Sequence, residues 1–150
     1  MALSISPTHT ITNAKKYQMT ETAARISRDI FNDHLDLSQK GRFEEDIVKN
    51  FSQDCVVLTN RGYYRGHAGL MELARILKQE LPNAEFKYIN RLVEDRFALL
   101  EWTADCGDVA VHDGADSFVI ENGKIVAQTI HYTLSIRNPE RIGSAVHRDS

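Results

Sequence analysis

The sequence predicts an α+β fold: a cone-shaped, curved antiparallel sheet that is wrapped by three helices and encloses a pocket. Two observations carry this prediction. In the first half of the chain, apolar residues recur every three or four positions, as in helices, whereas in the second half they alternate, as in strands. Helices gathered ahead of successive strands are typical of α+β folds, because α/β folds interleave the two kinds of element.

Three helices are expected in the N-terminal half, each with an apolar stripe along one face. The first spans about residues 20–40 and ends at Gly41, since glycine commonly terminates helices. The second spans about residues 43–51. The third spans about residues 67–81, where Pro82 closes it because proline cannot continue a helix.

Strands are expected where short apolar runs lie between turn residues. The turn Asn60-Arg61-Gly62 joins a first hairpin, and Asn122-Gly123, a strong hairpin signal, joins the last two strands of a four-stranded meander. The expected strands are residues 55–58, 63–65, 84–93, 96–105, 115–120 and 124–136, with another turn at Asp113-Gly114.

Composition indicates a single globular domain. The chain has 150 residues, and its formal net charge of −3 argues against strong binding to nucleic acid or to an anionic membrane. No apolar run approaches the roughly 20 residues that span a bilayer. Cys55 and Cys106 are interpreted as reduced thiols of a cytoplasmic protein. We expect a loose arm at residues 1–19, the domain at 20–137 and a loose tail at 138–150.

Both faces of the late strands are half apolar. In residues 96–105, for example, Leu100 and Trp102 share one face while Leu99 and Glu101 share the other. A monomeric antiparallel sheet normally exposes one polar face to water. We therefore expect one face to cover the helices and the cavity, and the other to form a homodimer.

No strong catalytic motif is present. The sequence lacks a P-loop and the G-x-G-x-x-G, G-x-S-x-G, H-E-x-x-H and C-x-x-C patterns, so no cofactor is expected. The six histidines show no ligand spacing, so no metal site is expected.

Asp116 is the first candidate site residue. It opens an apolar strand and shares a face with Phe118, so burial would raise its pKa and let the neutral acid donate a hydrogen bond. The alternative is a strand-end aspartate that caps a turn or pairs with a base in solvent.

His34 and Glu101 are the next candidates, because both interrupt apolar patterns. His34 lies on the apolar stripe of the first helix, where it could hydrogen-bond a substrate oxygen or transfer a proton. The alternative is a core histidine with its hydrogen bonds satisfied. Glu101 would form a carboxylate pair with Asp116 if it faced inward, and would otherwise be an outward residue of an alternating strand.

Tyr132 is the fourth candidate, as an oxyanion donor or acid, because it shares a strand face with Gln128 and Ile130. Packing of the ring, with the hydroxyl at the surface, is the alternative. Together the expected catalytic residues are Asp116, His34, Glu101 and Tyr132, and the expected substrate-binding residues are Gln128, Ile130, Phe118, Thr59 and Leu99.

Three strings resemble the nuclear-transport-factor-2-like superfamily, in its SnoaL-like and ketosteroid-isomerase-like branch. They are GRFEEDIVKNFSQDCVVL (residues 41–58), YRGHAGLMELARIL (64–77) and GADSFVIENGKIVAQTIHYTL (114–134). The resemblance covers residues 20–136 and implies the fold described above. It does not single out an activity, because the superfamily includes isomerases, cyclases, dehydratases, epoxide hydrolases and non-catalytic binders.

The resemblance also implies roles for individual residues. Asp116 is similar in position to the neutral acid of ketosteroid isomerases, and His34 to the tyrosine that assists it. The base position falls on Thr59, which cannot act as a carboxylate, so a base would come from Glu101 or His34. The resemblance places Glu101, Gln128, Ile130 and Tyr132 in the cavity, and Leu100, Trp102, Thr129 and His131 at a dimer interface.

Three functions remain open at this point. The first is a cofactor-independent isomerase, cyclase or dehydratase that acts on a cyclic or polyketide-like carbonyl compound by acid/base chemistry. The second is a non-catalytic binder of a small hydrophobic ligand, which the threonine at position 59 favours. The third is a dimerisation module with a vestigial cavity.

Overall fold

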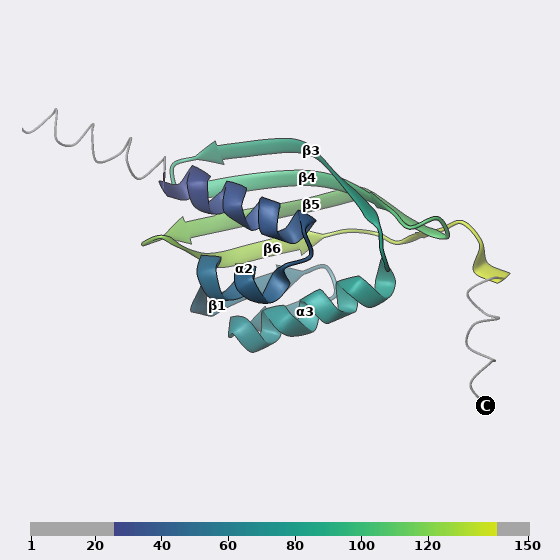
Figure 1. Cartoon of the computed structure of the whole chain (residues 1–150), viewed down its shortest axis with the longest axis horizontal. Coiled ribbons are helices and arrows are strands. Elements are labelled where there is room, and N and C mark those ends of the chain that lie inside the picture. The colour runs from purple at the N-terminus through teal and green to yellow at the C-terminus, as the bar shows by residue number, and fades with distance from the viewer. Residues whose placement is uncertain (1–25, 141–150) are drawn as a thin grey trace, which may run out of the picture.

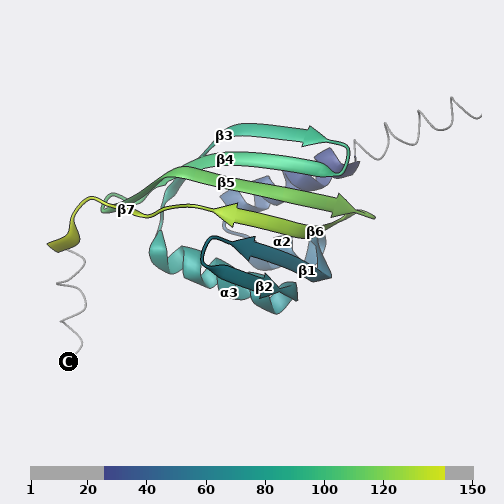
Figure 2. The same cartoon turned by 180° about the vertical axis from the view of Figure 1, so that it is seen from behind.

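The computed structural model describes residues 26–140 of the chain. Three helices lie on one face of a single sheet, whose strands follow the order β2-β1-β6-β5-β4-β3 (Figure 1). Seen from behind, the other face of the sheet is not covered by any of these helices (Figure 2). The predicted α+β fold is therefore confirmed.

The helices agree with the apolar stripes of the sequence. The first helix is described over residues 26–39, so the expected start near residue 20 lies outside the described part. It ends at Gly41, which has a φ of +69°, and the Arg42 N–H returns to the Leu37 carbonyl at 2.9 Å. This closure is a glycine-dependent helix end. Helices α2 (Phe43–Asn50) and α3 (Gly66–Glu80) follow within one residue of the expected bounds.

The predicted hairpin and meander are both present. β1 pairs with β2 in antiparallel fashion, and β3, β4, β5 and β6 pair successively in the same way. The first hairpin joins the meander through a parallel pairing of β1 with β6, which gives the mixed sheet. The strands are β1 (Phe51–Thr59), β2 (Gly62–Arg65), β3 (Glu85–Glu94), β4 (Phe97–Asp105), β5 (Val109–Glu121), β6 (Lys124–His131) and β7 (Ser135–Ile136).

One predicted turn is wrong. Asp113-Gly114 lies inside β5, which starts at Val109 rather than at residue 115. Gly114 pairs with Trp102 of β4, and a Cβ atom built on it would lie 2.3 Å from the indole ring. Because Gly114 has no side chain, the large side chain on the neighbouring strand can pack directly against its backbone. Glycine within strands is known to allow such close contacts.

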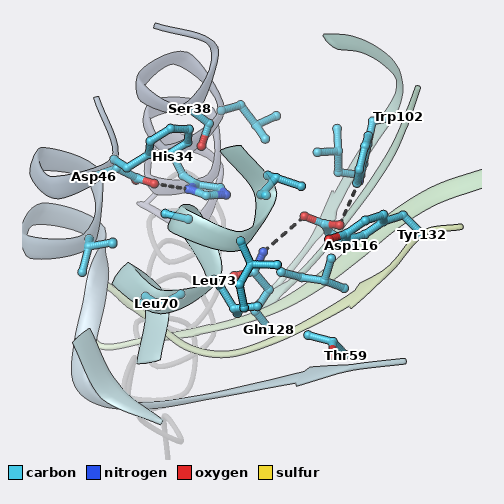
Figure 3. A pocket seen from close by; sticks show the side chains of 18 of the residues that line it. His34, Ser38, Asp46, Thr59, Leu70, Leu73, Trp102, Asp116, Gln128 and Tyr132 are labelled. Carbon is cyan, nitrogen blue, oxygen red and sulfur yellow. Dashed lines mark hydrogen bonds and ion pairs between the residues drawn. The ribbon is translucent and has the colours of Figure 1, made fainter. Parts of the chain in front are cut away.

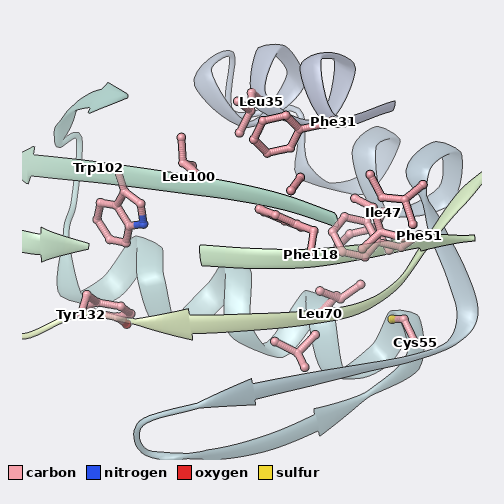
Figure 4. Packing of buried hydrophobic residues seen from close by; sticks show 14 of the residues in the cluster. Phe31, Leu35, Ile47, Phe51, Cys55, Leu70, Leu100, Trp102, Phe118 and Tyr132 are labelled. Carbon is pink, nitrogen blue, oxygen red and sulfur yellow. The ribbon is translucent and has the colours of Figure 1, made fainter. Parts of the chain in front are cut away.

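The main core lies between the helices and the concave face of the sheet (Figure 4). Phe31 of the first helix and Phe118 of β5 are fully buried, with ring centroids 5.4 Å apart in an edge-to-face contact. Burying one such ring stabilises the fold by about 1.5–3 kcal/mol. Leu100, Trp102 and Tyr132 belong to this core and also line the cavity, so the core positions the site.

Two further sequence features can be checked. Cys55 and Cys106 are free cysteines, as expected. Within residues 26–140, no helix combines the length and the apolar character that crossing a membrane requires.

Candidate active site

A cavity of about 250 Å³ lies between the concave face of the sheet and the helices (Figure 3). Its wall is largely apolar, with contributions from the first helix, α2, α3 and the inner positions of the strands. A few polar side chains interrupt this wall. They are His34, Ser38, Asp46, Thr59, Arg61, Tyr64, Tyr88, Asp116, Gln128 and Tyr132.

Asp116 is the acidic side chain at the centre of the sheet wall. Only 9% of the residue is exposed, and its two carboxylate oxygens accept one hydrogen bond each. The donors are Nε1 of Trp102, at 2.9 Å, and Nε2 of Gln128, at 3.2 Å. Burial raises the pKa of Asp116 to about 6, although both hydrogen bonds and His34 favour the charged form. The group therefore titrates close to neutral pH.

His34 enters the cavity from the helical side. Its Nδ1 lies 2.7 Å from Oδ2 of Asp46, whose other oxygen accepts a hydrogen bond from Asn50 at 2.9 Å. Edge-to-face contacts with Phe51 and Phe118 hold the ring. The second ring nitrogen, Nε2, points away from Asp46 toward the cavity (Figure 3). A carboxylate that fixes the orientation of an imidazole is a common arrangement in acid/base catalysis.

A third group of polar side chains lies where the cavity meets solvent. The carboxylate of Glu80 accepts two hydrogen bonds from the Arg61 guanidinium, one of them 2.9 Å long, and a third from the Tyr132 hydroxyl at 2.5 Å. Arg61 also donates to the Tyr132 oxygen and stacks over its ring at 4.8 Å. The phenolic proton of Tyr132 is thus held by Glu80. Burial and Glu80 raise the pKa of Tyr132, which opposes its ionisation.

The structure places most of the predicted site residues together. Asp116, His34, Tyr132, Gln128, Ile130 and Thr59 all line the cavity. Phe118 is fully buried behind it and packs against the His34 ring. The Thr59 hydroxyl donates to the Gly62 carbonyl at 2.9 Å, so its proton is used within the hairpin turn.

Glu101 and Leu99 were placed on the wrong face. Glu101 is exposed on the outer face, where its carboxylate accepts a hydrogen bond from Asn90 at 3.0 Å, and Leu99 shares that face. Leu100 and Trp102 face inward instead and are buried, so they do not lie at an outer interface. The face of β4 that contains Trp102 carries only apolar side chains. Burying that face is therefore more favourable than burying the face that carries Glu101.

Four residues that contact the candidate site residues were not predicted as part of the site: Asp46, Arg61, Glu80 and Trp102. Each acts through a partner that is distant in the chain, such as Asp46 for His34 and Glu80 for Tyr132. Only Asp46 carried a usable signal. It is an acidic residue between apolar positions of α2, on the buried face of that helix. Within the described residues, no three His, Cys, Asp or Glu side chains are grouped as metal ligands would be.

The fold resembles many solved structures. An NTF2-like protein of unknown function from Mesorhizobium loti aligns with a TM-score of 0.64 and 16% identity, over 73% of this chain and 93% of that one. A candidate ketosteroid isomerase from Kribbella flavida aligns with a TM-score of 0.62 and 15% identity, over 77% and 83%. A candidate polyketide cyclase from Sinorhizobium meliloti aligns with a TM-score of 0.54 and 20% identity, over 68% and 93%. At these identities the likeness shows the fold alone.

The sequence itself matches a family. No curated protein matches the chain significantly. The model of the SnoaL-like domain, however, matches residues 31–128, which include most of the first helix, the cavity lining apart from Ile130 and Tyr132, and both Asp116 and His34. The chain therefore belongs to the SnoaL-like domain family.

Proposed function

We propose that the cavity binds a small, largely apolar carbonyl compound and that Asp116 and His34 catalyse proton transfer on it without a cofactor. The observation that carries this proposal is the pairing of two titratable side chains that face one apolar cavity, each held by its own partners. Isomerisation, cyclisation and dehydration of such compounds all begin with loss of a proton next to a carbonyl group. Names of neighbours such as the candidate ketosteroid isomerase and polyketide cyclase agree with this class of chemistry.

The hydrogen bonds suggest which group acts as base. Both oxygens of Asp116 accept N–H groups, and a pKa of about 6 leaves the carboxylate ionised at neutral pH. Asp116 would thus remove a proton from the carbon beside the carbonyl, and the C–H electron pair would form the enolate. His34, whose Nδ1 lies against Asp46, would donate a hydrogen bond or proton from Nε2 to the enolate oxygen. These roles are the reverse of those expected from the sequence.

Hydrogen–deuterium exchange tests this proposal without knowledge of the natural substrate. The probe is 2-tetralone, a cyclic ketone, whose α-protons exchange with D₂O at a rate that NMR measures. The wild-type protein should accelerate exchange above the buffer rate, and Asp116→Asn should lower that acceleration by about 100-fold or more, as loss of a general base does. His34→Gln should also lower it.

Glu101→Gln is the matched control, because it neutralises another carboxylate of the same sheet that lies on the outer face. It should leave the exchange rate unchanged. Equal loss in Glu101→Gln and Asp116→Asn would contradict the proposal.

A non-catalytic binding function is the second candidate. It is favoured by one observation: the end of β1 carries Thr59, whose hydroxyl is engaged by Gly62, where related isomerases are expected to carry a carboxylate base. A wild-type protein that binds 2-tetralone but does not accelerate its exchange would support this binder and refute the enzyme.

We also propose that the outer face of the sheet forms a homodimer. Leu92 and Phe97 are 56% and 50% exposed on that face, and their strand partners there include Leu99 and Val119. Exposed apolar patches of this kind commonly mark interaction sites. Sedimentation should therefore give a dimer, and Leu92→Glu with Phe97→Glu should convert it to a monomer. A monomeric wild-type protein would overturn this proposal.

A further inference from the structure

Arg61, Glu80 and Tyr132, the rim cluster, lie at the solvent end of the cavity and have no role in the proton transfer proposed above. They come from the β1–β2 turn, the end of α3 and the segment after β6. The side chain of Arg61 is 45% exposed and lines the cavity, whereas that of Glu80 is 20% exposed and stands behind it. The cluster therefore sets the charge that an entering molecule meets.

Arg61 is the one lysine or arginine among the described residues that line the cavity. On its own it would attract a carboxylate, because the guanidinium binds carboxylates with two parallel hydrogen bonds. Glu80 already occupies that position through Nη1 and Nη2, and Nη2 also donates to Tyr132. Three of the five N–H donors are thus used, and the positive charge of Arg61 is balanced.

Two further carboxylates, Asp116 and Asp46, line the cavity. Asp116 has no cationic partner among the described residues other than His34, and the Asp46 carboxylate is shared between His34 and Asn50. Arg61 holds the pKa of Glu80 below its usual value, so this carboxylate is ionised at neutral pH. A ligand carboxylate would lose its water on entering and would find no unbalanced cation in this part of the structure.

We propose that Glu80 is a specificity-determining residue: by balancing Arg61, it makes the cavity accept uncharged carbonyl compounds and reject their carboxylate analogues. This inference rests on the proposed function, since it assumes that the cavity holds a small carbonyl compound. The N–H groups of Arg61 that Glu80 and Tyr132 leave unused can still donate to an uncharged oxygen of the ligand. The rim cluster would then select by charge while still orienting the ligand.

Two probes with the same acetylphenyl body test this inference. Methyl 4-acetylbenzoate and 4-acetylbenzoate differ in one methyl group and in charge, and their dissociation constants are measured by calorimetry at pH 8 in low salt. The wild-type protein should bind the uncharged ester at least about tenfold more tightly than the carboxylate, a difference that corresponds to about 1.4 kcal/mol. Glu80→Gln should abolish or invert this preference, because it leaves Arg61 with an unbalanced charge.

Two other variants keep the test decisive. Glu72→Gln removes an exposed glutamate of the same helix, which pairs with Arg75 and does not line the cavity, and it should leave the preference unchanged. Arg61→Gln removes the cation without exposing a new one, so the carboxylate should still be rejected. If Glu80→Gln fails to fold, Arg61→Gln still provides a test of the charge selection.

Each outcome decides between the two proposals. Equal binding of both probes by the wild-type protein, or an unchanged preference in Glu80→Gln, would overturn the charge selection and leave the proton-transfer proposal standing. Preference for the carboxylate by Arg61→Gln would also overturn it. Failure of both probes to bind the wild-type protein would contradict the selection as well as the cavity function on which it rests.

Discussion

Asp116 and Glu101 are two carboxylates on neighbouring strands, and each accepts a hydrogen bond from a side-chain amide on the strand beside it. Gln128 donates to Asp116 at 3.2 Å on the inner face, and Asn90 donates to Glu101 at 3.0 Å on the outer face. Only Asp116 is buried, and burial raises its pKa to about 6. The comparison teaches that the face of the sheet, more than the bonded partner, decides whether a carboxylate is suited to acid/base chemistry.

The pH dependence of stability should show the largest difference. The folded-state pKa of Asp116 is raised above its unfolded value, so the folded state binds the proton more tightly and loses stability as pH rises from about 4 to 6. A shift from 3.8 to about 6 corresponds to roughly 3 kcal/mol of unfolding free energy. The stability of Asp116→Asn minus that of wild type should therefore increase by about this amount between pH 4 and pH 8.

Urea denaturation of both proteins at pH 4 and pH 8 measures this change. Stability that Asp116→Asn loses through altered hydrogen bonds cancels between the two pH values, if that loss does not depend on pH. Glu101→Gln should show a much smaller change, because Glu101 is not buried within the protomer. Equal changes in the two variants would remove the distinction between the faces.

Gly114→Ala should have the next largest effect. The added methyl group would lie 2.3 Å from the Trp102 ring and 2.7 Å from its carbonyl oxygen, so either the indole or the strand must move. Overpacking of this kind typically costs about 1–3 kcal/mol. Gly114 does not have a positive φ, so the cost of Gly114→Ala reports this clash rather than backbone strain. Thermal unfolding measures the cost, and an unchanged melting temperature would contradict the clash.

Trp102→Phe should raise the pKa of Asp116 further, because it removes an N–H donor to the carboxylate while burial remains. We expect an increase of about one unit, which corresponds to roughly 1.4 kcal/mol. Carbon-13 NMR of labelled aspartate measures it directly. A pKa that falls, or that stays the same, would show that Trp102 does not control the charge of Asp116.

The smallest effect is expected on the outer face. In the monomer given by Leu92→Glu with Phe97→Glu, Glu101→Gln should change the unfolding free energy by less than about 0.5 kcal/mol at pH 7, as for most exposed substitutions. Chemical denaturation measures this value. A loss of several kcal/mol in this monomeric background would contradict the exposed position of Glu101 on the protomer.

Much of the fold could be predicted because helix and strand periods depend on local sequence. The choice between the two faces of β4 was harder, since alternation defines two sets of residues without saying which is buried. The face of β4 with Trp102 is entirely apolar, and this property correctly indicates that it is buried. The expected carboxylate pair of Glu101 with Asp116 indicated the wrong face. The register shift between Trp102 and Ala104 was not visible in the sequence either.

The candidate site was only partly predictable for a related reason. Asp116 and His34 interrupt apolar patterns and can be recognised locally. Their supporting partners depend on tertiary contacts: Asp46 is 12 residues from His34, and Glu80 is 52 residues from Tyr132. No local pattern links such pairs, so the roles of Arg61 and Glu80 emerged only from the structure.

The most direct test of the account is a pH titration of intrinsic fluorescence. Trp102 is the only tryptophan of the chain, and its Nε1 donates to the carboxylate that is proposed to act as the base. Its emission should change in a single step with a midpoint near pH 6, in wild type and in Glu101→Gln, and this step should vanish in Asp116→Asn. A step that persists in Asp116→Asn, or the absence of any step between pH 4.5 and pH 8 in the wild-type protein, would contradict the account.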